Sequence, residues 1–173
     1  LLKTDEGVRH NTSLHRDPYV HRILRSNVLE NQQQLGREMA SIVGTYQHER
    51  NENCDEYFKA VGVPFIPRKM MAMSSPRLEI TNEGEKWTIR SVTMLRTIEI
   101  TFTLGEEYEE HMPAGVTLKN VTTMDGDSLE TVSIGPDDQR VVRKYEFSEE
   151  GAVLTMTHEK SGQVAKRYFK RLS

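Results

Sequence analysis

The sequence predicts an all-β domain, a sandwich or barrel of about ten strands, preceded by a polar segment. From residue 40 onward the apolar residues mostly recur with a period of two, which is the pattern of a half-buried strand. Turn-forming residues interrupt these runs at a spacing of roughly 8–12 residues, which is typical of antiparallel folds. The residues before Met39 show neither feature.

Residues 1–38 are polar and weakly patterned. An apolar group between Tyr19 and Leu29, just after Pro18, is compatible with one short amphipathic helix. No apolar stretch of the kind found in a signal peptide occurs here. The chain opens with Leu1, whereas Met39 reads like a natural start. We therefore expect residues 1–38 to be a loose or weakly helical extension, either an upstream translated stretch or a regulatory or targeting arm, and residues 39–173 to be the folded domain.

One strand near 43–49 comes first, and two short helices then break the strand pattern. Asn53 is a suitable N-cap for the first helix and Gly62 a suitable residue just beyond its end. The second helix has Pro67 near its start and ends before Pro76. Three methionines lie inside this second helix, namely Met70, Met71 and Met73.

The nine remaining strands are separated by turns that contain glycine, for example Gly84, Gly105 and Gly126. Within one of them, Ile98, Ile100, Phe102 and Leu104 alternate cleanly and share a face. We expect these strands near residues 77–82, 86–92, 97–104, 107–111, 117–124, 128–134, 139–147, 152–158 and 163–171.

Composition excludes several classes of function. The formal net charge of −3 and pI of about 6.1 disfavour binding to nucleic acid through bulk positive charge. No apolar run is long enough to span a membrane as a helix. Cys54 is the single cysteine, which rules out a disulfide within the chain and fits a reducing compartment. Cys54 has no sequence context for catalysis, and we expect no enzyme activity, cofactor or metal site.

An arginine interrupts the apolar face of the strand near 139–147. Val141, Arg143, Tyr145 and Phe147 share that face. A guanidinium inside an apolar interior costs several kcal/mol without a partner, and a carboxylate is its best partner. Neither this strand nor the last one carries an acid on the same face, so a bound hydrophobic acid could supply the carboxylate.

The last strand also carries an arginine on a face with apolar residues, but its sequence does not show which of its two faces points inward. Ala165, Arg167 and Phe169 share one face, but Val164 and Tyr168 on the other face are apolar too. Strand periodicity alone leaves open which face of this strand lies inside.

Several segments together resemble the intracellular lipid-binding proteins, that is, the fatty acid-binding and cellular retinoid-binding proteins. The resemblance covers about residues 40–172. It rests on Val43-Gly44-Thr45-Tyr46, on the run from Asn53 to Val63 (NCDEYFKAVGV), on Arg68-Lys69-Met70, and on the block from Thr97 to Glu110 (TIEITFTLGEEYEE).

The resemblance implies a ten-stranded antiparallel up-and-down barrel with a two-helix lid, holding a long-chain fatty acid or a retinoid. In many members two arginines and a tyrosine bind the ligand carboxylate. Arg167 matches one arginine, Phe169 replaces the tyrosine without its hydroxyl, and either Arg143 or Tyr145 matches the other arginine. These departures leave retinoids and other lipids as alternatives to a plain fatty acid.

The family pattern also assigns the portal, the cavity and the partners. Portal and cavity positions are Tyr57, Met70, Met73, Leu95, Phe102 and Met156. Lys59, Arg68 and Lys69 would form a basic rim that docks transiently on anionic membranes. The expected protein is a monomeric cytoplasmic carrier without a nucleic-acid partner. The alternative class is a peripheral membrane protein whose lipid is structural.

Overall fold

The computed structural model describes residues 18–112 and 115–173, which form three α-helices and ten β-strands. The strands are β1 Gly44–Glu52, β2 Arg77–Glu83, β3 Lys86–Val92, β4 Thr97–Thr103, β5 Glu107–His111, β6 Thr117–Asp125, β7 Ser128–Ile134, β8 Arg140–Phe147, β9 Gly151–His158 and β10 Gln163–Arg171. All ten predicted strands are confirmed, and β1 continues three residues further than expected, to Glu52.

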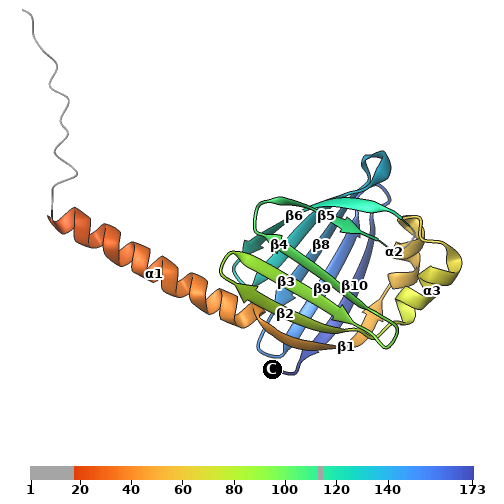
Figure 1. Cartoon of the computed structure of the whole chain (residues 1–173), viewed down its shortest axis with the longest axis horizontal. Helices are drawn as coiled ribbons and strands as arrows, with labels where there is room; N and C mark the ends of the chain where they lie inside the picture. Colours follow the sequence, from red (N-terminus) through yellow and green to blue (C-terminus); the bar gives the residue numbers. More distant parts are fainter. Residues whose placement is uncertain (1–17, 113–114) are drawn as a thin grey trace, which may run out of the picture. The chain divides into compact units, whose positions relative to one another are not determined.

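The strands form one antiparallel sheet that curls into a nearly closed barrel (Figure 1). Consecutive strands pair with each other except β4 with β5, and β1 also pairs with β10. The sheet order therefore starts at β4 and ends at β5, and these two edges do not pair with each other. The predicted all-β fold with an up-and-down barrel is confirmed.

Helix α1, Pro18–Ile42, is 25 residues long and exceeds the short helix that we predicted. Its sequence is rich in Gln, Leu, Arg and Glu, which are good helix formers, and Gly36 is the one poor helix former after the first turn. The residues up to Arg37 form a unit separate from residues 38–173. None of the described helices combines the length and the apolar character needed to cross a membrane.

Helices α2, Cys54–Ala60, and α3, Phe65–Met73, form a lid at one end of the barrel (Figure 1). Asn53 lies at the N-cap position as predicted, and its carbonyl oxygen accepts a hydrogen bond from the Tyr57 N–H at 3.1 Å, but its side chain does not cap the helix. This residue has φ 52°, and its side-chain amide donates instead to the Val164 carbonyl oxygen at 2.7 Å. The prediction for Gly62 is confirmed, because it has φ 84° and the backbone N–H of Val63 reaches the Phe58 carbonyl at 2.9 Å.

An apolar cluster fills the end of the barrel opposite the lid. Tyr46, Trp87 and Leu129 are almost completely buried there, and the ring of Phe147 lies 5.5 Å from that of Tyr46. Buried aromatic side chains supply much of the burial energy of such a core. The lid end, in contrast, has no residue of α3 that is fully buried, so polar contacts take a larger part in holding it.

Gly151 should be needed for the close approach of β9 to β10. A Cβ atom on this residue would lie 1.9 Å from the Phe169 carbonyl oxygen. We expect Gly151→Ala to lower the free energy of unfolding by about 1–3 kcal/mol or more, the cost of overpacking, measured by urea denaturation. Gly36→Ala is the control, because nothing lies within 4 Å of its added Cβ. Equal unfolding midpoints for the two variants would contradict this account.

Candidate functional site

Both arginines singled out in the sequence lie inside the barrel. Arg167 on β10 is 9% exposed, and the side chain of Arg143 on β8 is 22% exposed. On the opposite face of β10, Val164 is 40% exposed. The structure thus decides the direction that strand periodicity left open, and Arg143, Tyr145, Arg167 and Phe169 all face the interior.

Arg143 forms a two-pronged ion pair with Glu110 on β5. Its Nη1 and Nη2 atoms lie 3.2 and 2.5 Å from the two carboxylate oxygens of Glu110. Asn120 on β6 donates to the same carboxylate at 2.8 Å, and Arg143 also donates to Ser133 Oγ at 3.1 Å. The protein itself therefore supplies the carboxylate that the sequence analysis assigned to a ligand at Arg143.

This pair shifts the titration of both groups. Burial alone would raise the pKa of Glu110, but the Arg143 guanidinium and the Asn120 amide outweigh it and hold the pKa below its usual value. Burial would lower the pKa of Arg143, but Glu110 raises it further above its usual value. Both groups are therefore charged at neutral pH and cancel each other inside the barrel.

Arg167 has no such partner. Its Nη2 atom donates to the backbone oxygen of Met71 in α3 and lies 3.4 Å from Ser74 Oγ. Among the residues whose side chains the structure describes (22–37, 42–112, 115–136 and 138–173), no carboxylate forms an ion pair with it. The neighbouring Cys54 stays a neutral thiol, because burial raises its pKa. Arg167 therefore carries a buried positive charge that no described carboxylate compensates.

Tyr145 and Phe169 border the two arginines. Burial raises the pKa of Tyr145, while Arg143 and Arg167 act on it in the opposite direction, so its hydroxyl lies in the field of both guanidiniums. Phe169 carries no hydroxyl and packs edge-on against the imidazole of His48, with ring centroids 5.6 Å apart. Tyr145 shares the inward face of β8 with Arg143 and carries the hydroxyl that Phe169 lacks.

One wall of the interior, from β5 to β8, is polar. The Tyr108 hydroxyl lies 2.8 Å from Thr122 Oγ1, which lies 2.8 Å from Thr131 Oγ1. Together with Glu110 and Asn120, these residues form a hydrogen-bonded lining that the sequence analysis missed. The alternation of residues along the strand places Glu110 on the same face as Tyr108 and Met112. Three further glutamates nearby made this inward-facing acid hard to single out from the sequence.

The predicted portal and cavity residues divide into two groups. Tyr57, Phe102 and Met156 are buried, and burial raises the pKa of Tyr57 to about 12. Met70, Met73 and Leu95 are instead exposed on the lid and on the turn between β3 and β4, Met73 to 83%. These three side chains are therefore placed at the outer surface around the lid end rather than inside.

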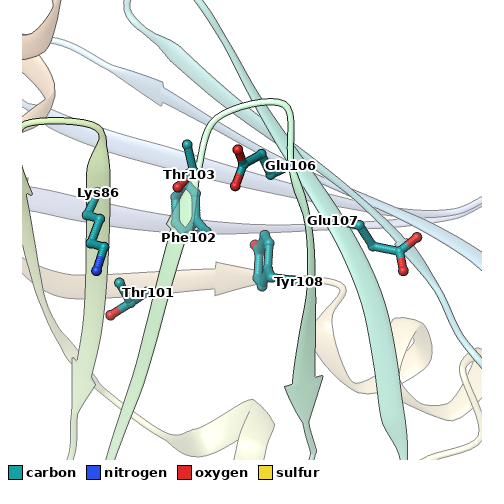
Figure 2. Close-up of a pocket in the computed structure, with 7 residues that line it drawn as sticks. All are labelled: Lys86, Thr101, Phe102, Thr103, Glu106, Glu107 and Tyr108. Carbon is teal, nitrogen blue, oxygen red and sulfur yellow. The ribbon is translucent and has the colours of Figure 1, made fainter.

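The described part of the chain also has a pocket of about 310 Å³ at the seam between β4 and β5 (Figure 2). The rings of Phe102 and Tyr108 stack there with centroids 5.2 Å apart, and Lys86, Glu106 and Glu107 lie at its rim. The pocket lies where the edge strands β4 and β5 do not pair with each other. No group of metal-binding side chains occurs among the described residues.

Comparisons with known proteins agree on one family. Residues 43–168 match the sequence model described as lipocalin / cytosolic fatty-acid binding protein family. A fatty acid-binding protein of Tyrophagus putrescentiae is 35% identical over 133 residues, covering 77% of this chain and 99% of the relative.

Two solved structures extend the comparison. A fatty acid-binding protein from brain tissue of Drosophila melanogaster has a TM-score of 0.69 and 32% identity, covering 75% of this chain and 99% of the other. A Schistosoma mansoni fatty acid binding protein in complex with arachidonic acid has a TM-score of 0.73 and 25% identity, covering 79% and 99%.

The Glu110–Arg143 pair should make a measurable contribution to stability. Glu110→Gln leaves Arg143 buried without a counter-charge, and we expect the free energy of unfolding at pH 7 to fall by about 3–5 kcal/mol. Glu146→Gln is the matched control, because Glu146 is an exposed partner of Lys144 at 3.4 Å and should cost at most about 1 kcal/mol.

The same pair predicts a pH dependence. Because the folded pKa of Glu110 is lowered, its stabilisation is complete above the unfolded pKa of about 4.3 and is lost as pH falls through the folded value. The stability difference between the wild type and Glu110→Gln, measured by urea denaturation, should therefore shrink below about pH 4. A difference that stays constant down to pH 2 would contradict the lowered pKa.

Proposed function

The chain belongs to the lipocalin / cytosolic fatty-acid binding protein family, and on this premise we propose that it is a carrier of a hydrophobic carboxylate, a long-chain fatty acid first of all. The observation that carries the proposal is the buried guanidinium of Arg167, which has no carboxylate partner in the described part of the chain. A monocarboxylate would neutralise this buried charge.

The head-group site has one primary residue and several supporting ones. Arg167 binds the carboxylate, and the Tyr145 hydroxyl, in the field of the same guanidinium, replaces the hydroxyl that Phe169 lacks. Arg143 is occupied by Glu110 and acts through the local field rather than as the first contact. The pairing of Arg143 with Glu110 supports Tyr145 for the second head-group position.

The tail of the ligand needs an apolar surface, which the walls opposite the polar lining supply. Leu78 and Ile80 on β2 and Met156 on β9 face inward and are buried. Burial of each methylene contributes about 0.8 kcal/mol, so chain length sets most of the affinity and Arg167 sets the preference for an acid. A neutral retinoid that binds more tightly than any fatty acid would favour the alternative ligand class.

Entry of the ligand involves the lid end and contact with a membrane. Phe65 and Ile66 on α3 and Leu95 on the β3–β4 turn are 63%, 71% and 81% exposed. The basic rim contributes less than expected, because Asp55 binds Arg68 at 3.0 Å and Lys69 at 2.7 Å. We therefore assign the membrane contact of this cytoplasmic, monomeric and non-enzymatic carrier to apolar insertion.

The head-group assignment is tested with Arg167→Gln. We expect its affinity for palmitic acid, measured by displacement of a fluorescent fatty acid, to fall about 10- to 100-fold, as for loss of hydrogen bonds to a charged group. Its affinity for hexadecanol should stay within a few-fold. Lys166→Ala, on the outward face of β10, is the control. Equal losses for the acid and the alcohol would refute the role of Arg167.

The lid contact is tested by transfer of a fluorescent fatty acid to vesicles of phosphatidylcholine and phosphatidylserine. The double variant Phe65→Ser, Ile66→Ser should transfer several-fold more slowly, because it removes exposed apolar side chains that insert into the interface. Val164→Ser, on the outer wall of β10, should transfer at the wild-type rate. Identical rates for all three proteins would remove the support for membrane contact through α3.

A further inference from the structure

The C-terminal turn of α3 is held to the barrel by two side chains. The last carbonyl groups of a helix lack partners within the helix, and here Arg167 on β10 donates to the Met71 oxygen while Asn51 on β1 donates to the Ala72 oxygen at 2.7 Å. Ser74, just beyond the helix, also donates to Met71 at 2.8 Å. Arg167 thus occupies the favourable position of a cation at a helix C-terminus.

Few other interactions keep α3 in place. No residue of α3 is fully buried, and only Met71 and Ala72 pack partly against the core. The ion pairs of α3 run to Asp55 in α2, which belongs to the same lid. The bond from Arg167 is therefore one of a small number of attachments between α3 and the barrel. Its loss should make the whole helix more mobile.

The stereochemistry of a guanidinium makes this bond sensitive to a ligand. A carboxylate can accept two parallel hydrogen bonds either from Nη1 and Nη2 or from Nε and Nη2, and Nη2 belongs to both pairs. In the structure Nη2 is the atom that contacts Met71 and Ser74, while Nε has no partner. Nη2 carries two N–H groups, one on each edge of the guanidinium. A two-pronged carboxylate on the edge that faces Met71 therefore takes the N–H that holds α3.

We propose that Arg167 is a latch, which holds the lid helix α3 through Met71 when no acid is bound and releases it when a ligand carboxylate takes over Nη2. This inference rests on the proposed function, since it requires that the carboxylate bind Arg167. The exchange favours the ligand, because a hydrogen bond between two charged groups is stronger than one to a neutral carbonyl. The chemical nature of the ligand head group thereby determines whether α3 is attached to the barrel.

The latch distinguishes acids from neutral lipids of the same length. A fatty acid fills the barrel and frees the C-terminal turn of α3. The corresponding alcohol fills the barrel equally but offers no carboxylate, so Arg167 stays on Met71 and α3 stays attached. The loaded protein should then carry a more mobile α3 only when its ligand is an acid.

The test is hydrogen–deuterium exchange of the full chain, followed on peptides that cover residues 65–76. The wild type is measured alone, with saturating palmitic acid and with saturating hexadecanol, and occupancy is confirmed by displacement of the fluorescent fatty acid. We expect the acid to raise the exchange rate of these amides several-fold over the alcohol complex. Arg167→Gln should exchange fast without ligand and show no further rise, and Lys166→Ala should behave as the wild type.

The outcomes separate the two claims. If palmitic acid binds but protects residues 65–76 as much as hexadecanol does, the latch is wrong and the carrier function stands. If neither palmitic acid nor any other long-chain acid binds, both claims fail. The comparison of acid with alcohol uses the wild type alone, so it decides the question even if Arg167→Gln does not fold.

Discussion

A charge inside an apolar barrel needs a counter-charge, and the rest of this structure follows from how the two interior arginines meet that need. Arg143 finds Glu110 within the protein, in a two-pronged pair supported by Asn120. Arg167 finds neutral oxygens only. One arginine therefore contributes to the stability of the fold, and the other keeps a free charge for a ligand.

The interior is divided accordingly. A polar wall on β5 to β8 holds the Glu110–Arg143 pair, which Asn120 and Ser133 hydrogen-bond, and beside it a chain of hydroxyl contacts through Tyr108, Thr122 and Thr131. An aromatic cluster around Tyr46 and Phe147 closes the far end. Helix α2 buries Cys54, Tyr57 and Phe58 in the core, whereas α3 buries no residue fully, so α3 is the part of the lid that can move with little loss of the core.

Helix α3 of the lid combines few buried contacts with an exposed apolar surface. Asp55 forms ion pairs with Arg68 and Lys69 and so offsets part of their positive charge. The apolar side chains of Phe65 and Ile66 therefore determine the character of the exposed surface of α3. Arg167 contacts the lid and also belongs to the proposed head-group site. In the proposed mechanism the same nitrogen atom, Nη2, either holds α3 or binds the ligand carboxylate. The proposed latch would couple ligand binding to membrane exchange directly, through this one residue.

The sequence by itself determined the all-β class, the ten strands, the two lid helices and Arg143 and Arg167 as the residues to examine, because alternation and turn residues are local signals. It left the direction of β10 open, since a period of two does not say which face is buried. Only the tertiary structure decided that Glu110 neutralises Arg143, that the Asn53 side chain turns to β10 rather than capping α2, and that Arg167 reaches α3. These contacts join residues 33, 111 and 96 positions apart, and such pairings arise from the closure of the barrel, which no local pattern records.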